Sequence, residues 1–182
     1  EKATDMIGKI DAVIVDHRHP KFHLPAVLPF VKKGIPTFVD KPFCYRAEKG
    51  RKFLEMARES GTPVTSFSVM SHQKSFGKFM RAKEKIGPVA SATTYGPSDL
   101  KSQWGGIFFY GIHQVDLILN AFGYEVKKVL MTRNGENAVG QLIYEKNFTV
   151  TMNFLKGGCN NFVMTAVGLE KTAHEIIHYD SD

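Results

Sequence analysis

The strongest constraint on the fold is the alternation of short apolar runs and helical stretches in residues 1–70. Residues 10–15 (IDAVIV) are apolar apart from Asp11 and rich in β-branched side chains, which predicts a strand buried on both faces. Further strand-like runs lie at residues 36–39 and 63–69, and helical stretches at 20–33 and 46–60 separate them. Strands that alternate with helices at this spacing form parallel sheets with right-handed crossovers. A parallel sheet flanked by helices is therefore expected.

The pattern changes after Met70. Helical stretches are expected at residues 75–86 and 105–122, with a strand between them at 89–95. Strand-like segments then follow one another without a helix, at residues 126–133, 138–144, 148–155 and 162–167. Turn signals such as Asn134-Gly135 favour antiparallel neighbours. The chain is therefore predicted to be α/β, with domains at residues 1–70 and 71–182 and an open, mostly antiparallel sheet in the second, an α+β domain.

The composition excludes several classes of protein. A hydrophobic content of 43% is typical of a globular chain, and no apolar run is long enough to cross a membrane. The net charge of +6 comes from scattered lysines without a nucleic-acid motif, so a solvated surface and no nucleic-acid partner are expected. With only Cys44 and Cys159, a disulfide framework is not expected, and a cytoplasmic location fits.

A lysine follows the second predicted strand, in the tripeptide Asp40-Lys41-Pro42. Ligands of parallel sheets bind at the carboxyl ends of the strands. A lysine there can donate to a substrate oxygen and help set the pKa of a nearby proton transfer. The alternative interpretation is a surface lysine in front of a loop proline.

A histidine lies within the apolar helix predicted at residues 105–122. On a helix, Phe109, His113 and Asp116 share one face, and Tyr110 is also a neighbour of His113. A histidine can exchange a proton with an alcohol near neutral pH. The alternative interpretation is a histidine packed in the core with its hydrogen bonds satisfied.

Taken together and in this order, these motifs resemble the glucose-fructose oxidoreductase, inositol dehydrogenase and MocA family. The shared features are IDAVIV, a helix start with a histidine, a Glu/Asp-Lys-Pro tripeptide, a Gly-Gly-led helix with Gly-x-His-x-x-Asp, and an open antiparallel sheet. The resemblance implies a two-domain enzyme that passes hydride between a carbinol and nicotinamide. The substrate would be a sugar, an inositol or a similar polyol, and the cofactor NAD or NADP.

The resemblance also implies roles for individual residues. Lys41 would contact the reacting hydroxyl, His113 would be the acid/base or substrate-binding histidine, and Asp116 would contact the substrate. The cofactor would lie beside the loops formed by Asp16, His17, His19, Pro20, His23, Asp40, Lys41 and Pro42. No metal is expected. Homo-oligomers through the open sheet face are expected as well.

This sequence departs from the family pattern at several points. Asp40 replaces the usual glutamate, and Phe109 stands where the family usually has an aspartate, four residues before His113. Tyr110 could take over the proton, although the usual tyrosine pKa of about 10 makes it a weak base. Phe109 motivates a second hypothesis, a non-catalytic relative with a binding or assembly role.

The glycine-rich turn that grips a dinucleotide, Gly-x-Gly-x-x-Gly, is not in the sequence. We therefore expect an incomplete Rossmann-like sheet, a chain that is a fragment, and weak binding of dinucleotide by these 182 residues alone.

The segment His174-Glu175-Ile176-Ile177-His178 matches the zinc-protease pattern His-Glu-x-x-His and suggests a third hypothesis, a zinc hydrolase. That chemistry needs a helix, where both histidines reach one metal. The local pattern predicts a strand, which would hold the two histidines roughly 13 Å apart. A metal site is therefore not expected there.

Overall fold

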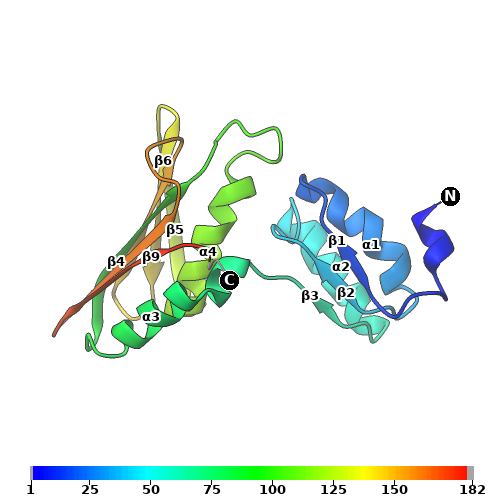
Figure 1. Cartoon of the computed structure of the whole chain (residues 1–182), viewed down its shortest axis with the longest axis horizontal. Coiled ribbons are helices and arrows are strands. Elements are labelled where there is room, and N and C mark those ends of the chain that lie inside the picture. The colour runs from blue at the N-terminus through cyan, green and yellow to red at the C-terminus, as the bar shows by residue number, and fades with distance from the viewer. Residues whose placement is uncertain (1, 180–182) are drawn as a thin grey trace. The chain divides into compact units, whose positions relative to one another are not determined.

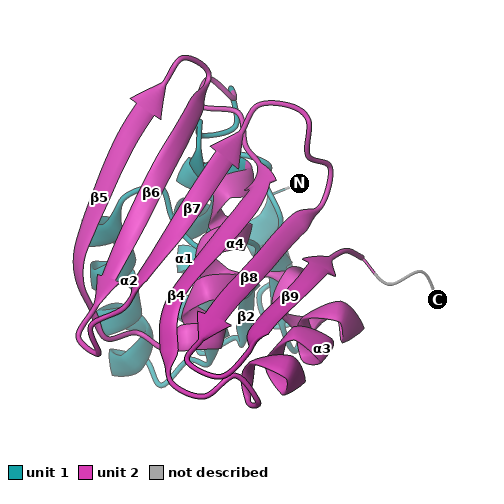
Figure 2. Cartoon of the chain, turned by 90° about the vertical axis from the view of Figure 1, so that its left-hand side faces the viewer, with its two compact units in different colours: residues 1–67, 103–109 teal, residues 68–102, 110–182 magenta. Residues whose placement is uncertain are grey.

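A computed structural model describes residues 2–179 (Figure 1). The chain divides into two compact units, which Figure 2 shows in different colours. Unit 1 consists of Glu1–Phe67 and Gln103–Phe109, and unit 2 of Ser68–Ser102 and Tyr110–Asp182. Within the described residues, none of the helices has the length and apolar character that crossing a bilayer would require.

Unit 1 is built on a small parallel sheet. Its strands β1 (Val13–Val15), β2 (Thr37–Val39) and β3 (Val64–Thr65) pair in the order β1-β2-β3, all parallel. The helices are α1 (His23–Val31) and α2 (Ala47–Glu59), with 3-10 turns η1 (Ala3–Met6) and η2 (Pro20–Phe22). This confirms the predicted alternation and the parallel arrangement. The strands are shorter than predicted, most of all β3.

The core of unit 1 lies on one face of this sheet. Val15 and Val39 point to that face and pack against apolar side chains from both helices, among them Val27 and Phe53. On the other face Ile14 is 72% exposed. The prediction that the first strand is buried on both faces is therefore wrong, because α1 and α2 contribute to the same core. A shallow apolar surface remains on the second face, lined by residues that include Ile14 and Phe38.

Unit 2 contains a six-stranded sheet in the order β5-β6-β7-β4-β8-β9. Its strands are β4 (Val89–Pro97), β5 (Val126–Asn134), β6 (Asn137–Tyr144), β7 (Thr149–Leu155), β8 (Phe162–Gly168) and β9 (Thr172–Ile177). All neighbours are antiparallel except β4 and β7, which are parallel. The sheet is thus mixed but mostly antiparallel, as predicted.

One face of the sheet in unit 2 is covered by α3 (Lys74–Lys83) and α4 (Phe108–Phe122), and Figure 2 looks onto the other face. A 3-10 turn, η3 (Val69–His72), precedes α3. Gln114 ties α4 to the sheet, because its side chain accepts from Thr94 Oγ1 at 2.7 Å and donates to the Asn153 carbonyl at 3.1 Å. Gly96 allows this close approach, since a Cβ there would lie 3.0 Å from Gln114 Nε2.

Candidate functional site

Lys41 lies just beyond the carboxyl end of β2, in unit 1. Its side chain is half-buried, and its Nζ lies 5.5 Å from the centre of the Phe109 ring. Burial lowers the pKa of Lys41, and the neighbouring Asp40 opposes this shift only in part. The ammonium therefore lies against an aromatic surface at the edge of the sheet where parallel-sheet proteins bind ligands.

The loop after β1 and the loop after β2 are joined by His23, the first residue of α1. Its side chain is fully buried. Its Nδ1 lies 3.0 Å from the Pro42 carbonyl oxygen, and its Nε2 lies 2.6 Å from that of His17. Both ring nitrogens are thus engaged by backbone carbonyls, so His23 holds the loop that carries Lys41 against the loop after β1.

The other expected cofactor residues lie on that first loop. Asp16 and His17 are exposed directly after β1, and Pro20 is buried at the start of η2. His19 caps η2, because its Nδ1 accepts the Lys21 backbone N–H at 3.2 Å. Partial burial, aided by Lys21, lowers the pKa of His19. Its ring packs edge-on against Tyr45 at 5.1 Å between centroids.

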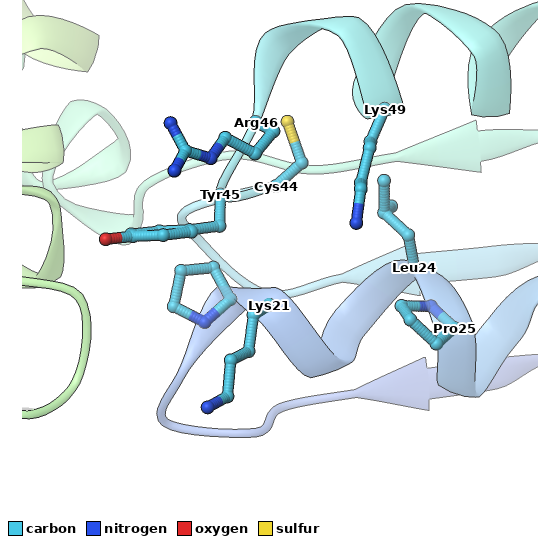
Figure 3. A pocket seen from close by; sticks show the side chains of 8 residues that line it. Lys21, Leu24, Pro25, Cys44, Tyr45, Arg46 and Lys49 are labelled. Carbon is cyan, nitrogen blue, oxygen red and sulfur yellow. The ribbon is translucent and has the colours of Figure 1, made fainter.

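A cavity of about 250 Å³ lies beside this loop, between the start of α1 and the start of α2 (Figure 3). Its lining is apolar with three basic side chains: Pro20, Lys21, Leu24, Pro25, Cys44, Tyr45, Arg46 and Lys49. Figure 3 shows Lys49 extending from α2 toward α1. Burial raises the pKa of the Cys44 thiol, although the backbone amides of Arg46 and Gly50 oppose the shift.

His113 lies in α4, in unit 2, with a side chain only 1% exposed. Its Nδ1 is 2.7 Å from the hydroxyl oxygen of Ser68, which is equally buried. Aromatic rings flank the imidazole, with centroid distances of 5.3 Å to Phe162 and 5.9 Å to Tyr110. The imidazole ring is therefore flanked by two aromatic rings, and its Nδ1 lies within hydrogen-bond distance of the Ser68 hydroxyl.

The neighbours of His113 on α4 differ in exposure. Tyr110 is 43% exposed, whereas Asp116 is half-buried. The Asp116 Oδ2 atom is buried and accepts no hydrogen bond from residues 2–179. This carboxylate oxygen therefore retains the capacity to accept from a ligand or solvent donor.

The predicted site residues fall into two groups. Lys41 and the cofactor-loop residues belong to unit 1, and His113, Tyr110 and Asp116 belong to unit 2. The prediction that Lys41 and His113 serve one substrate stays a prediction. Sequence reasoning missed Ser68, because it is 45 residues from His113 and no local pattern links them.

The His-Glu-x-x-His segment lies on β9 rather than on a helix, as its local pattern predicted. His174 faces the neighbouring strand β8, and its Nδ1 is 2.9 Å from Thr165 Oγ1. His178 lies beyond the end of the strand. The helical geometry on which the zinc-protease pattern depends is therefore not present. Among residues 2–179, no three side chains of His, Cys, Asp or Glu cluster as a metal site would require.

The chain is similar to known proteins in its structure. No family model and no curated protein matches the sequence. A probable dehydrogenase from Thermotoga maritima superposes with a TM-score of 0.84 at 16% identity, over 100% of this chain and 62% of that one. Myo-inositol 2-dehydrogenase from Lactobacillus plantarum gives 0.81 at 18% identity, over 95% and 60%.

A third solved structure is an oxidoreductase from Agrobacterium radiobacter in complex with NAD+, L-tartaric acid and magnesium, with a TM-score of 0.81 at 15% identity over 95% of this chain and 58% of that one. The fold is that of the glucose-fructose oxidoreductase, inositol dehydrogenase and MocA family. The chain spans less than two thirds of the length of these three proteins.

Proposed function

We propose that this chain is part of an NAD(P)-dependent oxidoreductase that acts on the carbinol of a polyol or sugar-like molecule. The observation that carries the proposal is Lys41, a half-buried ammonium at the carboxyl end of a parallel strand. The shared fold supports it, and so do the inositol dehydrogenase and the NAD+ complex among the solved structures with that fold.

The loops of unit 1 fit the nicotinamide end of such a cofactor. The loop after β1 and the loop after β2 leave the carboxyl ends of adjacent parallel strands, where dinucleotides bind, and His23 holds them together. The sequence contains no glycine-rich phosphate turn, so we assign only the nicotinamide side to these residues. When bound, nicotinamide supplies the hydride acceptor.

In this proposal, each polar group has one task. Lys41 donates a hydrogen bond to the carbinol oxygen, and this bond stabilises the negative charge that develops as the proton leaves. His113 accepts that proton, which neutral imidazole does well near pH 7. Asp116 accepts from a second substrate hydroxyl, for which its buried oxygen has the capacity.

The assay is NAD+ or NADP+ reduction by a panel of polyols that includes myo-inositol, D-glucose and L-tartrate, with the complete natural protein that contains this chain. Lys41→Met should lower kcat/KM at least about 100-fold, because it removes the donor to the reacting oxygen. The exposed Lys33 provides the matched control, since Lys33→Met removes a positive charge at a position outside the loops after β1 and β2. Equal activity of the two variants would contradict the role of Lys41.

The second candidate function is a non-catalytic relative with a binding or assembly role, favoured by the apolar Phe109 in contact with Lys41. The same panel separates the two candidates. A non-catalytic relative would reduce neither NAD+ nor NADP+ with any polyol of the panel. Calorimetry would still detect binding of one of these cofactors or polyols.

We infer further that copies of this chain associate through the uncovered face of the sheet in unit 2. One row on that face crosses all the strands without a formal charge: Leu130, Gln141, Thr151, Thr93, Thr165 and His174. An uncharged row of this kind can pack against its own copy with little desolvation cost. Thr151→Lys should then reduce the oligomer in analytical ultracentrifugation, whereas Lys127→Thr should not.

A further inference from the structure

The cavity between the starts of α1 and α2 combines a basic rim with a lining that contains no aspartate or glutamate. Lys21, Arg46 and Lys49 line it, and all three side chains are exposed. Within residues 2–179, none of the three forms an ion pair with a carboxylate. Figure 3 shows Lys49 extending toward α1, while Arg46 and Lys21 lie on either side of the Tyr45 ring. The cavity is therefore a place of positive potential.

The start of α2 adds to this potential. Arg46 is the N-cap residue of α2, and its side chain makes no hydrogen bond to the first turn. The N-terminus of a helix carries a partial positive charge, and its free N–H groups favour anions. The acidic residue of that turn, Glu48, lies 4.0 Å from Arg51 and does not line the cavity. The helix end and the basic side chains thus act in the same direction.

The rest of the lining is mostly apolar. Pro20 and Leu24 are buried, and the Tyr45 ring is held edge-on by His19 at 5.1 Å and by Phe108 at 5.9 Å between centroids. An apolar lining with a few polar groups is typical of small-molecule sites. The volume of about 250 Å³ is slightly below the range of about 300–1,000 Å³ that is common for drug-sized ligands, so the occupant would be smaller.

The charge of the rim selects among anions. A phosphate monoester carries about two negative charges at pH 7, whereas a carboxylate carries one, so the phosphate balances three cations better. The planar guanidinium of Arg46 matches two phosphate oxygens, and a lysine ammonium adds a point charge.

We propose that this cavity binds a small organic phosphate, a phosphate monoester on an apolar body. The phosphate contacts Arg46 and Lys49 at the start of α2, and the apolar body packs against Leu24 and Tyr45. The proposal does not depend on dehydrogenase activity, because neither Lys41 nor the residues of α4 line the cavity.

The first test measures the charge of the cavity through Cys44, which lines it. In the complete natural protein, alkylation by anionic iodoacetate and by neutral iodoacetamide is followed by mass spectrometry of the Cys44 and Cys159 peptides. Both reagents react with the thiolate, so the ratio of their rates does not depend on the pKa of the thiol, which burial raises for Cys44. At low ionic strength, the iodoacetate-to-iodoacetamide ratio should be at least about threefold higher at Cys44 than at Cys159, and salt should reduce the difference.

Charge reversal within α2 provides the matched pair of variants. Lys49→Glu should remove the preference of Cys44 for iodoacetate, because it replaces a cation of the lining by an anion. Lys52→Glu makes the same change at an exposed position of the same helix outside the lining, and it should retain most of the preference. Equal ratios at the two cysteines of the wild type, or the same loss in both variants, would refute the positively charged cavity.

The second test uses phenyl phosphate as the probe. It should slow the reaction of iodoacetamide with Cys44 at least about threefold at millimolar concentration, without effect on Cys159. Inorganic phosphate lacks the apolar body and benzoate has a single charge, so each should protect Cys44 less at the same concentration. Lys49→Glu should abolish the protection by phenyl phosphate, and Lys52→Glu should keep it. Absence of protection, or equal protection by inorganic phosphate, would overturn the proposed site, and stronger protection by benzoate would overturn the choice of phosphate.

Discussion

The sheets of the two units bury their side chains in different ways. In unit 1, the strands are two or three residues long, and their apolar side chains point to both faces, of which α1 and α2 cover one. In unit 2, the strands are six to nine residues long, and buried side chains alternate with more exposed ones along β6, β7 and β8. The pattern of apolar residues thus shows which faces a strand could bury. Only the packed structure shows which of these faces are buried.

The largest effect on stability is expected at Gly168, where the packing of unit 2 leaves no space for a Cβ atom. A Cβ there would lie 2.0 Å from the Ile86 carbonyl oxygen, and that backbone atom accepts a hydrogen bond from the Glu170 N–H. Gly168→Ala should therefore lower the free energy of unfolding by about 3 kcal/mol in urea denaturation.

Gly157 provides the control for this substitution, because a Cβ there would meet nothing within 4 Å. Gly157→Ala should change the free energy of unfolding by less than about 0.5 kcal/mol. Similar stability of the two alanine variants would show that the turn between β8 and β9 adapts, and unit 2 would then be less tightly packed than described.

A smaller effect is expected at Val39, in the covered face of unit 1. Val39 is fully buried against α1 and α2, so Val39→Ala should cost about 2 kcal/mol. Trp104 is the single tryptophan and belongs to unit 1, so its fluorescence reports the unfolding of that unit. If circular dichroism and fluorescence show the same loss of stability, the two units unfold together. If only fluorescence shows the loss, they unfold separately.

Much of this fold could be predicted because its signals are local. The alternation that predicted β1, α1 and β2 depends on residues close together, and so does the strand at His174. The parallel pairing of β4 with β7 could not be predicted, because strands that follow one another without helices favour antiparallel neighbours. The exposure of Ile14 was missed for a related reason, since the run IDAVIV is compatible with burial on both faces.

Tyr144 tests the core of unit 2 through a hydrogen bond. Its hydroxyl donates to the Gly123 carbonyl at 3.1 Å, and its ring stacks on Phe148 at 4.5 Å between centroids. Tyr144→Phe keeps the stacking but loses the donor, so it should cost about 1 kcal/mol at pH 7. Thermal unfolding of the two proteins would measure the difference.

The same residue predicts a dependence on pH. Burial, with a contribution from Glu125, raises the pKa of Tyr144 from 10.0 to about 12, so the folded state favours the protonated phenol. Its contribution to stability is therefore complete below pH 10 and is lost as the pH rises toward 12. The stability difference between wild type and Tyr144→Phe should shrink over that range, and a constant difference would contradict the shift.

The smallest effect is expected at Ile14, on the uncovered face of unit 1. Because Ile14 is 72% exposed, Ile14→Thr should change stability by less than about 0.5 kcal/mol, and the β-branched side chain preserves the strand. A loss above about 1 kcal/mol by Trp104 fluorescence would mean that this face is covered in solution. The contrast between units 1 and 2 would then be weaker than described.

The candidate site was predictable only in part, for the same reason as the fold. Lys41 and His113 could be proposed from the sequence because each follows a local signal, a strand end in one case and a helix face in the other. The bond between Ser68 and His113, and the engagement of both His23 nitrogens by backbone carbonyls, depend on segments that only tertiary structure brings together. Neither leaves a pattern in the sequence.

The position of β4 has a consequence for the order in which unit 2 folds. This strand is the first of its sheet along the chain, yet its neighbours are β7 and β8, and Ser91 pairs with Thr149. The hairpins β5–β6, β6–β7 and β8–β9 can form from nearby residues, whereas β4 must close a long loop before it pairs. Of the strands in this sheet, β4 is synthesised first, and both of its edges stay unpaired until β7 has been synthesised; the second edge stays unpaired until β8 follows.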